Sequence, residues 1–225
     1  MKFLKAGILL AITLFTTSCE SKIKNKMEPA QEVVLAEKYS KQDLQKYETA
    51  YFASGCFWCV EAIFESVKGV KEVISGYSGG TEENPTYEQV GYGKTSHAEA
   101  VEVYYDPKEI SYIELVQVFF GSHDPTSLNR QGPDRGAQYR SIAFYKNPEE
   151  KKIIESYMAA LEESKMYGDP IVTEVTAFTK FYDAEDYHQD YERKHPDNSY
   201  IRQVSVPRLN RFKKNFPDYL KKEVH

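Results

Sequence analysis

The chain has 225 residues, of which 41% are hydrophobic and 14% aromatic, so it has room for one medium-sized domain with a sizeable core plus extensions, but not comfortably for two domains. Its formal net charge of −5 argues against a nucleic-acid-binding protein and favours an acidic domain. The three cysteines, Cys19, Cys56 and Cys59, are too few for a disulfide framework, so each needs its own explanation.

Residues 1–19 have the pattern of an export signal that ends at Cys19. Two lysines supply the positive end, and the apolar stretch from Ala6 to Phe15 is shorter than the roughly 20 residues that cross a bilayer. The end of the segment resembles a bacterial lipoprotein signal, although Thr16 stands where that pattern usually has Leu. We therefore expect a lipid anchor on Cys19 in the cell envelope, with a soluble secreted or periplasmic protein as the alternative.

Residues 20–48 are rich in Lys, Glu and Gln and have few apolar side chains. Together with Pro29, this composition is typical of a tether or a loosely held helix. As a flexible coil, a segment of this length has an r.m.s. span of about 30 Å. It would hold the main domain, residues 49–225, clear of a membrane surface.

From residue 49 onward, strand and helix patterns alternate without an internal repeat, which predicts a single domain of mixed α and β structure. Long ordered loops in compact domains are usually functional, and residues 123–138 form such a loop. The predicted strands are Thr49–Ala53, Val70–Tyr77, Ala98–Tyr105, Tyr139–Tyr145 and Ile171–Phe178, and the predicted helices are Cys56–Val67, Tyr112–Phe120, Pro148–Glu163 and Ala184–Arg193.

Cys56 stands at the junction between the first predicted strand and the first predicted helix. The partial positive charge at a helix N-terminus stabilises a thiolate and lowers the pKa of the thiol, which favours Cys56 as a nucleophile. Cys59 follows one helical turn later, so the two sulfurs can meet and cycle between dithiol and disulfide. The competing interpretations are two structural cysteines on a buried helix face, and a zinc site, for which His97 has no paired spacing; we expect no metal.

Six short blocks of sequence are more specific than the CxxC pair alone. They are GCFW at 55–58, GYSGG at 76–80, NPTY at 84–87, HAE at 97–99, HDPT at 123–126 and GPDRGAQYRS at 132–141. Any one block is weak evidence, but in this order they resemble the peptide methionine sulfoxide reductase A family across about residues 49–191.

This resemblance implies an α+β fold, a two-layer sandwich with a mixed β-sheet and a ferredoxin-like core. It also implies a catalytic domain at 49–225 that reduces methionine S-sulfoxide, protein-bound or free, and so repairs oxidised proteins. The implied reaction leaves Cys56 as a sulfenic acid, the first and reversible step of cysteine oxidation. No bound cofactor and no nucleic acid are implied, and we expect a monomer.

The resemblance assigns proton donation to the sulfoxide oxygen to Glu99. The strand pattern supports this role, because Glu99 shares a face with Val101 and Val103, and a carboxyl at the end of an apolar face keeps its proton. Without the resemblance, an exposed glutamate with an ordinary pKa would be the favoured interpretation. The hydroxyls of Tyr87 and Tyr139 match those that hydrogen-bond the sulfoxide oxygen.

Three further residues match the family's substrate site. Phe57 and Trp58 correspond to the aromatic pocket for the substrate methyl group, although by themselves they fit core packing equally well. Asp134 corresponds to a residue that orients substrate and ordered water, which is compatible with a role in a turn. His123 and His188 also lie in family-like blocks, but we expect them to be structural hydrogen-bonding residues and leave them out of the site.

The second cysteine departs from the common family pattern. Many members have Gly at the position of Cys59 and place their resolving cysteines near the C-terminus, whereas no cysteine follows Cys59 in this chain. We therefore expect Cys59 to attack the sulfenic acid of Cys56, giving a disulfide that thioredoxin or another dithiol reductant opens. Direct attack of an external thiol on Cys56 is the alternative.

Two other functions compete with this interpretation. A thioredoxin-like disulfide oxidoreductase would also carry a CxxC motif, but Phe57 and Trp58 replace the usual Pro-containing pair, and the blocks at 84–87 and 132–141 would have no role. A surface lipoprotein that binds a partner or metal through its aromatic loops does not predict a uniquely reactive Cys56.

Overall fold

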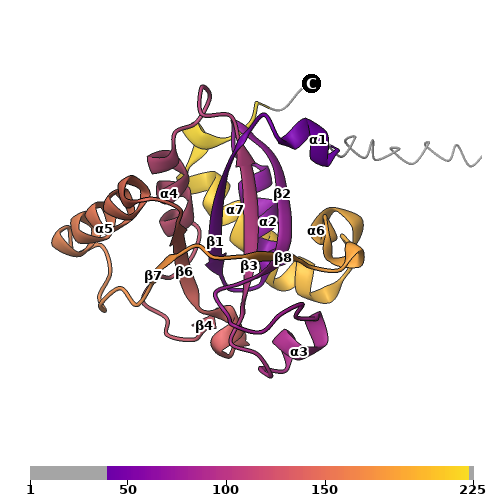
Figure 1. Cartoon of the computed structure of the whole chain (residues 1–225). Helices are drawn as coiled ribbons and strands as arrows, with labels where there is room; N and C mark the ends of the chain where they lie inside the picture. Colours follow the sequence, from indigo (N-terminus) through magenta and orange to yellow (C-terminus); the bar gives the residue numbers. More distant parts are fainter. Residues whose placement is uncertain (1–39, 223–225) are drawn as a thin grey trace, which may run out of the picture. The chain divides into compact units, whose positions relative to one another are not determined.

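The computed structural model of the chain describes residues 40–222 (Figure 1). The predicted signal with Cys19 and most of the predicted tether lie outside the described residues. At the end of the tether, Lys41–Leu44 form the short helix α1, and Leu44 is buried. No helix within residues 40–222 combines the length and the apolar character needed to cross a bilayer.

Within residues 40–222, six strands form one mixed sheet in the order β7-β6-β1-β3-β2-β8 (Figure 1). Neighbouring strands are antiparallel except β6 and β7, which are parallel. The strands are β1 (Glu48–Ser54), β2 (Val70–Ser78), β3 (Ala98–Tyr105), β6 (Ser141–Tyr145), β7 (Glu174–Ala177) and β8 (Phe181–Asp183). A separate two-stranded ribbon pairs β4 (Arg130–Gln131) with β5 (Asp134–Arg135).

Helices cover one face of this sheet and enclose the main core. In the view of Figure 1, α2 (Phe57–Glu65) and α7 (Val206–Asn215) lie behind the strands, and α4 (Tyr112–Gly121) contributes to the same core. The other face carries a smaller apolar cluster covered by the segment that joins β7 to β8, where the ring of Phe178 stacks on that of Tyr51 at 3.7 Å. The predicted α+β class with a mixed sheet is therefore confirmed.

Local sequence explains the elements whose bounds were predicted best. In β3, residues alternate between the two clusters: Val101 and Val103 belong to the main core, whereas Ala98 and Ala100 belong to the smaller one. The helix α5 (Pro148–Glu163) begins as predicted, because the side chain of Asn147 caps it and Pro occupies its first turn.

The predicted helix Ala184–Arg193 is wrong as a continuous element. A 3-10 turn at Asp186–His188 and the short helix α6 (Tyr191–Lys194) are separated by Asp190, whose φ of 57° breaks the helix. The side chain of Gln189 accepts from Ser75 N and donates to Ser75 O, so it pairs with β2 as a strand would. A sequence pattern does not reveal this tertiary contact.

The C-terminal region holds further structure that the sequence did not predict. A π-helical turn at Ile201–Ser205 leads into α7. Outside this region, the short helix α3 (Tyr87–Gly91) was not predicted either, and a loop at residues 92–97 follows it. Tyr139 ends a 3-10 turn, so β6 starts two residues later than predicted.

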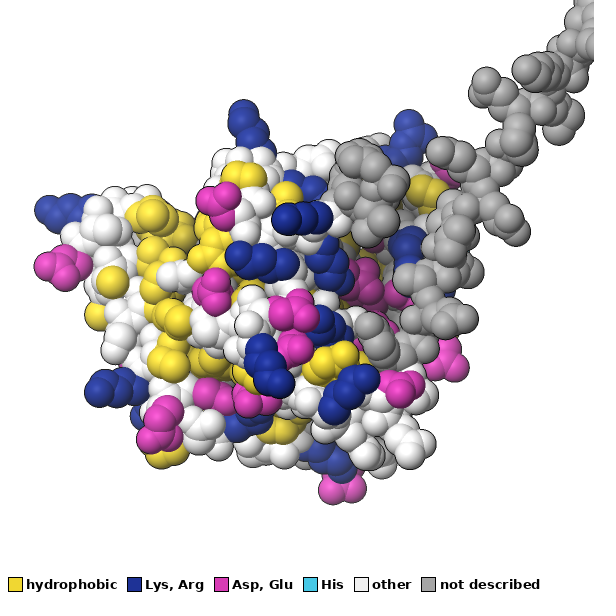
Figure 2. Space-filling view, turned by 90° about the horizontal axis from the view of Figure 1, so that it is seen from above, with side chains coloured by type: hydrophobic (Ala, Val, Ile, Leu, Met, Phe, Trp, Pro, Cys, Tyr) yellow, Lys and Arg dark blue, Asp and Glu magenta, His cyan; other side chains and the backbone are white. Residues whose placement is uncertain are grey.

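On the face shown in Figure 2, Lys and Arg side chains are interspersed with Asp and Glu.

Candidate active site

The strand-to-helix junction places Cys56 at the N-terminal end of α2. Gly55 has a φ of 91°, and a Cβ there would lie 2.6 Å from Cβ of Gln131, so only glycine fits this turn. The carbonyl of Cys56 accepts from the N–H groups of Cys59 at 3.1 Å and Val60 at 3.3 Å, which begins the helix. The prediction that Cys56 stands at a helix start is confirmed.

Both thiols are free and buried, and the side chains of Cys56 and Cys59 contact each other. Burial raises the pKa of the Cys56 thiol well above its usual value, and the neighbouring Cys59 and Glu99 raise it further. The predicted lowering by the helix N-terminus is therefore wrong for the reduced site, because loss of water outweighs the helix field. The hydrogen bond from Cys56 lowers the pKa of Cys59, and the charge of Arg208 contributes.

Glu99 approaches the thiol pair from β3. Its side chain is 2% exposed, and its Oε2 accepts from the backbone N–H of Phe57 at 3.0 Å, one residue after Cys56. Burial raises the pKa of Glu99 to about 8, although the hydrogen bond from Phe57 opposes this shift. The prediction of a desolvated carboxyl that keeps its proton at neutral pH is confirmed.

Tyr87 and Tyr139 come from two segments that flank the site. Tyr87 is the first residue of α3, which Thr86 caps, and Tyr139 ends the 3-10 turn of the long loop. Burial raises the pKa of both hydroxyls, and Glu99 raises each further, which places both tyrosines near that carboxyl. Both hydroxyls therefore keep their protons at neutral pH and can act as hydrogen-bond donors.

The aromatic residues after Cys56 differ in burial. Phe57 is 1% exposed, with Tyr87 stacked at 6.2 Å and His188 at 5.1 Å between ring centroids. Trp58 is half-buried and stacks on Tyr191 at 3.7 Å. Phe57 thus belongs to the main core and also lies beside Tyr87 and His188, so core packing and a place in the substrate pocket are compatible interpretations of this residue.

Asp134, from β5, reaches the thiols through a residue that the sequence did not single out. The hydroxyl of Tyr200 donates to Oδ2 of Asp134 at 2.6 Å, and the hydroxyl oxygen of Tyr200 lies 3.8 Å from Sγ of Cys59. Burial raises the pKa of Asp134, whereas the hydrogen bond from Tyr200 and the charge of Arg208 lower it.

Arg208 is the second residue that the sequence analysis missed. It is 7% exposed on α7, and its guanidinium donates to the carbonyls of Ser122 at 2.9 Å and Ser54 at 3.0 Å. These contacts fix a positive charge next to the end of β1, two residues before Cys56. Apolar residues at helical spacing, Ile201, Leu209 and Phe212, were the available signal for structure after residue 193.

The two histidines left out of the site behave differently. His123 is structural, as predicted, because Nδ1 donates to the Phe119 carbonyl at 2.7 Å and Nε2 accepts from Ser141 Oγ at 2.7 Å. His188 also makes a hydrogen bond, as predicted, since its Nδ1 accepts from Nε1 of Trp58 at 3.1 Å, but it lies in the aromatic cluster beside Phe57. This bond fixes the orientation of the indole.

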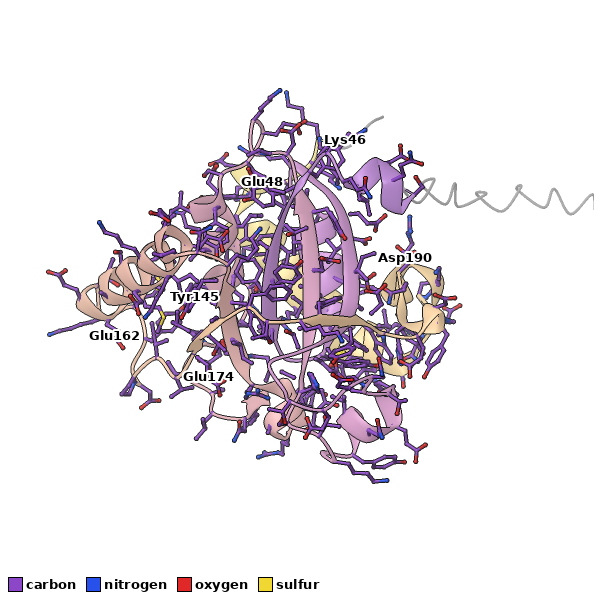
Figure 3. The ribbon with its side chains drawn as sticks, in the orientation of Figure 1. Lys46, Glu48, Tyr145, Glu162, Glu174 and Asp190 are labelled. Carbon is purple, nitrogen blue, oxygen red and sulfur yellow. The ribbon has the colours of Figure 1, made fainter. Side chains whose placement is uncertain are left out.

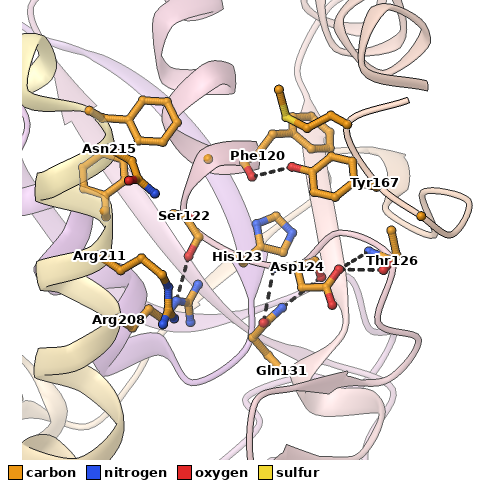
Figure 4. A pocket seen from close by; sticks show the side chains of 15 residues that line it. Phe120, Ser122, His123, Asp124, Thr126, Gln131, Tyr167, Arg208, Arg211 and Asn215 are labelled. Carbon is orange, nitrogen blue, oxygen red and sulfur yellow. Dashed lines mark hydrogen bonds between the residues drawn. The ribbon is translucent and has the colours of Figure 1, made fainter. Parts of the chain in front are cut away.

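A cavity of about 670 Å³ lies between α7 and the long loop (Figure 4). Arg208, Asp124, Gln131 and Tyr167 line it, and neither thiol does. The thiol site therefore lies outside this cavity, and Arg208 is the residue that belongs to both.

One group of acidic residues within 40–222 has ligand atoms within 4.8 Å of one another, Glu61, Glu65 and Asp190 (Asp190 is labelled in Figure 3). Burial raises the pKa of Glu61 to about 8, and Asp190 pairs with Arg193 at 2.6 Å. The raised pKa of Glu61 and the ion pair between Asp190 and Arg193 thus reduce the negative charge of this acidic group. The ring of His97 contacts Gly80 N and Glu82 O, so it is not brought to the thiols as a zinc ligand.

Two buried thiols at a helix start, beside a carboxyl that keeps its proton, define the site of a thiol-dependent oxidoreductase. The family model described as peptide methionine sulfoxide reductase matches residues 48–220. Peptide methionine sulfoxide reductase MsrA 2 of Synechocystis is 49% identical over 77% of this chain and 82% of its own length, and MsrA of Sulfolobus acidocaldarius is 52% identical over 76% and 96%.

Solved structures agree with these relatives. Methionine sulfoxide reductase A of Corynebacterium diphtheriae has a TM-score of 0.60 at 37% identity, covering 67% of this chain and 76% of that one. The reduced form of Mxr1 from Saccharomyces cerevisiae has a TM-score of 0.63 at 34% identity, covering 72% and 91%. The chain belongs to the peptide methionine sulfoxide reductase family, a family of oxidoreductases, and the family match includes Tyr200 and Arg208.

Replacing Glu99 by Gln should lower the single-turnover rate of methionine sulfoxide reduction by about 10²–10⁴-fold at neutral pH, because the variant has no acidic proton. The ratio of the wild-type rate to the Glu99→Gln rate should stay constant below a pH of about 8 and fall above it, since only the wild type loses a proton there. Titration of Cys56 is common to both proteins and cancels in this ratio.

The matched control is Glu102→Gln, on the opposite face of β3, where the carboxyl accepts from the hydroxyls of Tyr51 and Tyr104. It should keep the wild-type rates at every pH. A wild-type to Glu99→Gln ratio that does not change with pH would contradict the proton-donor role.

Proposed function

We propose that the protein reduces methionine S-sulfoxide, in oxidised proteins or free, to methionine, and so repairs oxidised proteins. The observation that carries this proposal is the buried carboxyl of Glu99, which accepts from the N–H of the residue next to Cys56 and whose pKa burial raises to about 8. A sulfoxide oxygen needs a proton when its sulfur is attacked, and here the nucleophile and the proton source meet at one helix end.

In the first step, the sulfur of Cys56 attacks the sulfoxide sulfur and the oxygen passes to Cys56. Glu99 protonates the oxygen as the S–O bond breaks, and the carboxylate then takes the proton of the Cys56 thiol. Methionine leaves with its sulfur reduced by two electrons, and Cys56 becomes a sulfenic acid. The high pKa of Cys56 means that this thiol holds its proton until substrate arrives.

The surrounding side chains are proposed to bind the sulfoxide group. The hydroxyls of Tyr87 and Tyr139 donate to the sulfoxide oxygen, and Asp134 orients substrate and water. The rings of Phe57 and Trp58 surround the substrate methyl group, a favourable contact for a thioether. The hydrogen bond from Trp58 to His188 supports this arrangement by fixing one wall.

Cys59 is proposed as the resolving cysteine. Its contact with Cys56 places the sulfur of Cys59 where it can attack the sulfenic acid, with release of water. Thioredoxin or another dithiol then reduces the Cys56–Cys59 disulfide. No bound cofactor is needed, because the two thiols supply both electrons.

The finer architecture and the location are proposals as well. The unit β1-α2-β2-β3-α4-β6, with the antiparallel order β6-β1-β3-β2, supports a ferredoxin-like core in a two-layer sandwich. The protein acts as a monomer. A lipid on Cys19 holds it in a bacterial cell envelope, and this location is supported by the sequence of residues 1–19 alone.

The reaction is tested by incubating the purified protein with N-blocked methionine sulfoxide and dithiothreitol and separating the two epimers by chiral chromatography. We expect the S epimer to disappear and the R epimer to remain, with no conversion by Cys56→Ser. Absence of turnover would refute the reductase proposal, and reduction of insulin by the same protein would then support disulfide exchange.

The resolving role is tested with one equivalent of substrate followed by mass spectrometry. Wild-type protein should contain a Cys56–Cys59 disulfide, whereas Cys59→Ser should retain a sulfenic acid on Cys56 that dimedone traps. Cys19→Ser, which removes the third cysteine, is the matched control and should still form the disulfide. A stable sulfenic acid without a disulfide in the wild type would contradict this role.

The anchor is tested by expressing the full chain in a bacterial host and separating membranes from soluble fractions. Wild-type protein should enter the membrane fraction and carry a lipid on Cys19, and Cys19→Ser should not. Cys59→Ser should remain with the membranes. Equal solubility of the wild type and Cys19→Ser would favour an ordinary secreted or periplasmic protein.

A further inference from the structure

The hydroxyl of Tyr200 lies between the thiol pair and a carboxyl. It donates to Oδ2 of Asp134 at 2.6 Å, a short distance typical of a strong bond to a charged acceptor. Because a tyrosine hydroxyl has one proton, the oxygen of Tyr200 faces Sγ of Cys59, 3.8 Å away, as an acceptor. Cys59, Tyr200 and Asp134 thus form a continuous chain of hydrogen bonds.

We propose that Tyr200 and Asp134 remove the proton of Cys59 in the resolving step. This inference rests on the proposed function, in which Cys59 attacks the sulfenic acid of Cys56. The proton of the Cys59 thiol moves to the oxygen of Tyr200 while the hydroxyl proton of Tyr200 moves to Asp134. The sulfur of Cys59 bonds to the sulfur of Cys56, the S–O bond breaks, and the hydroxide takes a proton from Glu99 and leaves as water.

Oxidation of Cys56 makes such an acceptor necessary. In the reduced site, the main cause of the low pKa of Cys59 is the hydrogen bond from the Cys56 thiol, which the first step consumes. The side-chain partners that then remain to Cys59 are Tyr200 and Ser205. Burial raises the pKa of Asp134, which suits this carboxyl to hold a proton, and that of Tyr200, which therefore does not ionise but passes a proton on.

Ser205 offers a rival route, because its hydroxyl donates to Oε2 of Glu192. Two observations favour the route through Tyr200. The hydroxyl of Tyr200 contacts both Cys56 and Cys59, so it lies where the S–S bond forms, whereas Ser205 contacts Cys59. The positive charge of Arg208 also lowers the pKa of both Cys59 and Asp134, so the same cation lies near the two ends of the Tyr200 route.

The experiment mixes the reduced protein with one equivalent of methionine sulfoxide, quenches with acid, and measures methionine and disulfide at each time. In Tyr200→Phe, we expect methionine to be released and the sulfenic acid to accumulate, with disulfide formation about 10²-fold slower at neutral pH. The slowed step should recover as the pH rises, because solvent can then take the proton of Cys59. A merely structural role of Tyr200 would not give this recovery.

Two further variants are the controls. Tyr167→Phe removes another partly buried hydroxyl, which donates to the Phe120 carbonyl at 3.2 Å, and should form the disulfide at the wild-type rate. Ser205→Ala should slow the disulfide less than Tyr200→Phe does. A larger effect of Ser205→Ala, or an unchanged disulfide rate in Tyr200→Phe, would overturn the proposed route.

The failure of the proposed function has a separate signature, namely no methionine from the wild type.

If Tyr200→Phe does not fold, as judged by circular dichroism, the relay is tested by measuring disulfide formation of the wild type in D₂O. Disulfide formation should then be slower than in H₂O, because protons move in that step, and the absence of a solvent isotope effect would refute the relay.

Discussion

The hydrogen bond from the N–H of Phe57 to the carboxyl of Glu99 is the contact on which the site depends. It joins β3 to the first turn of α2, two segments 42 residues apart in the chain. The same contact satisfies a helix N-terminal donor that has no partner within the helix. A single bond therefore places a proton-holding carboxyl beside Cys56 and fixes the start of the helix that carries both thiols.

Burial, rather than the helix field, determines the protonation of this site. The charge effect at a helix end is worth about 0.3–1 kcal/mol, less than one pKa unit, whereas full burial shifts the pKa of an acid by up to about 3–5 units. This comparison explains why the pKa values of both Cys56 and Glu99 are raised. Both groups hold protons until a polar substrate enters, which suits a reaction that consumes a proton at the sulfoxide oxygen.

The C-terminal region completes the site by bringing one cation and one hydroxyl to it. A buried charge needs partners, and the guanidinium of Arg208 finds them in the carbonyls of Ser54 and Ser122. These bonds hold α7 against the end of β1. The π-helical turn before α7 follows Tyr200, whose hydroxyl links Asp134 with Cys59.

The sequence by itself determined the place of Cys56 at a helix start and the buried face of β3, because the turn at Gly55 and the alternation around Val101 are local signals. The six ordered blocks also gave the family, which the comparisons confirm. Only the tertiary structure decided the direction of the Cys56 pKa shift and the placement of Tyr200 and Arg208 beside the thiols. Burial and contacts between distant segments depend on packing, which no local pattern of residues encodes.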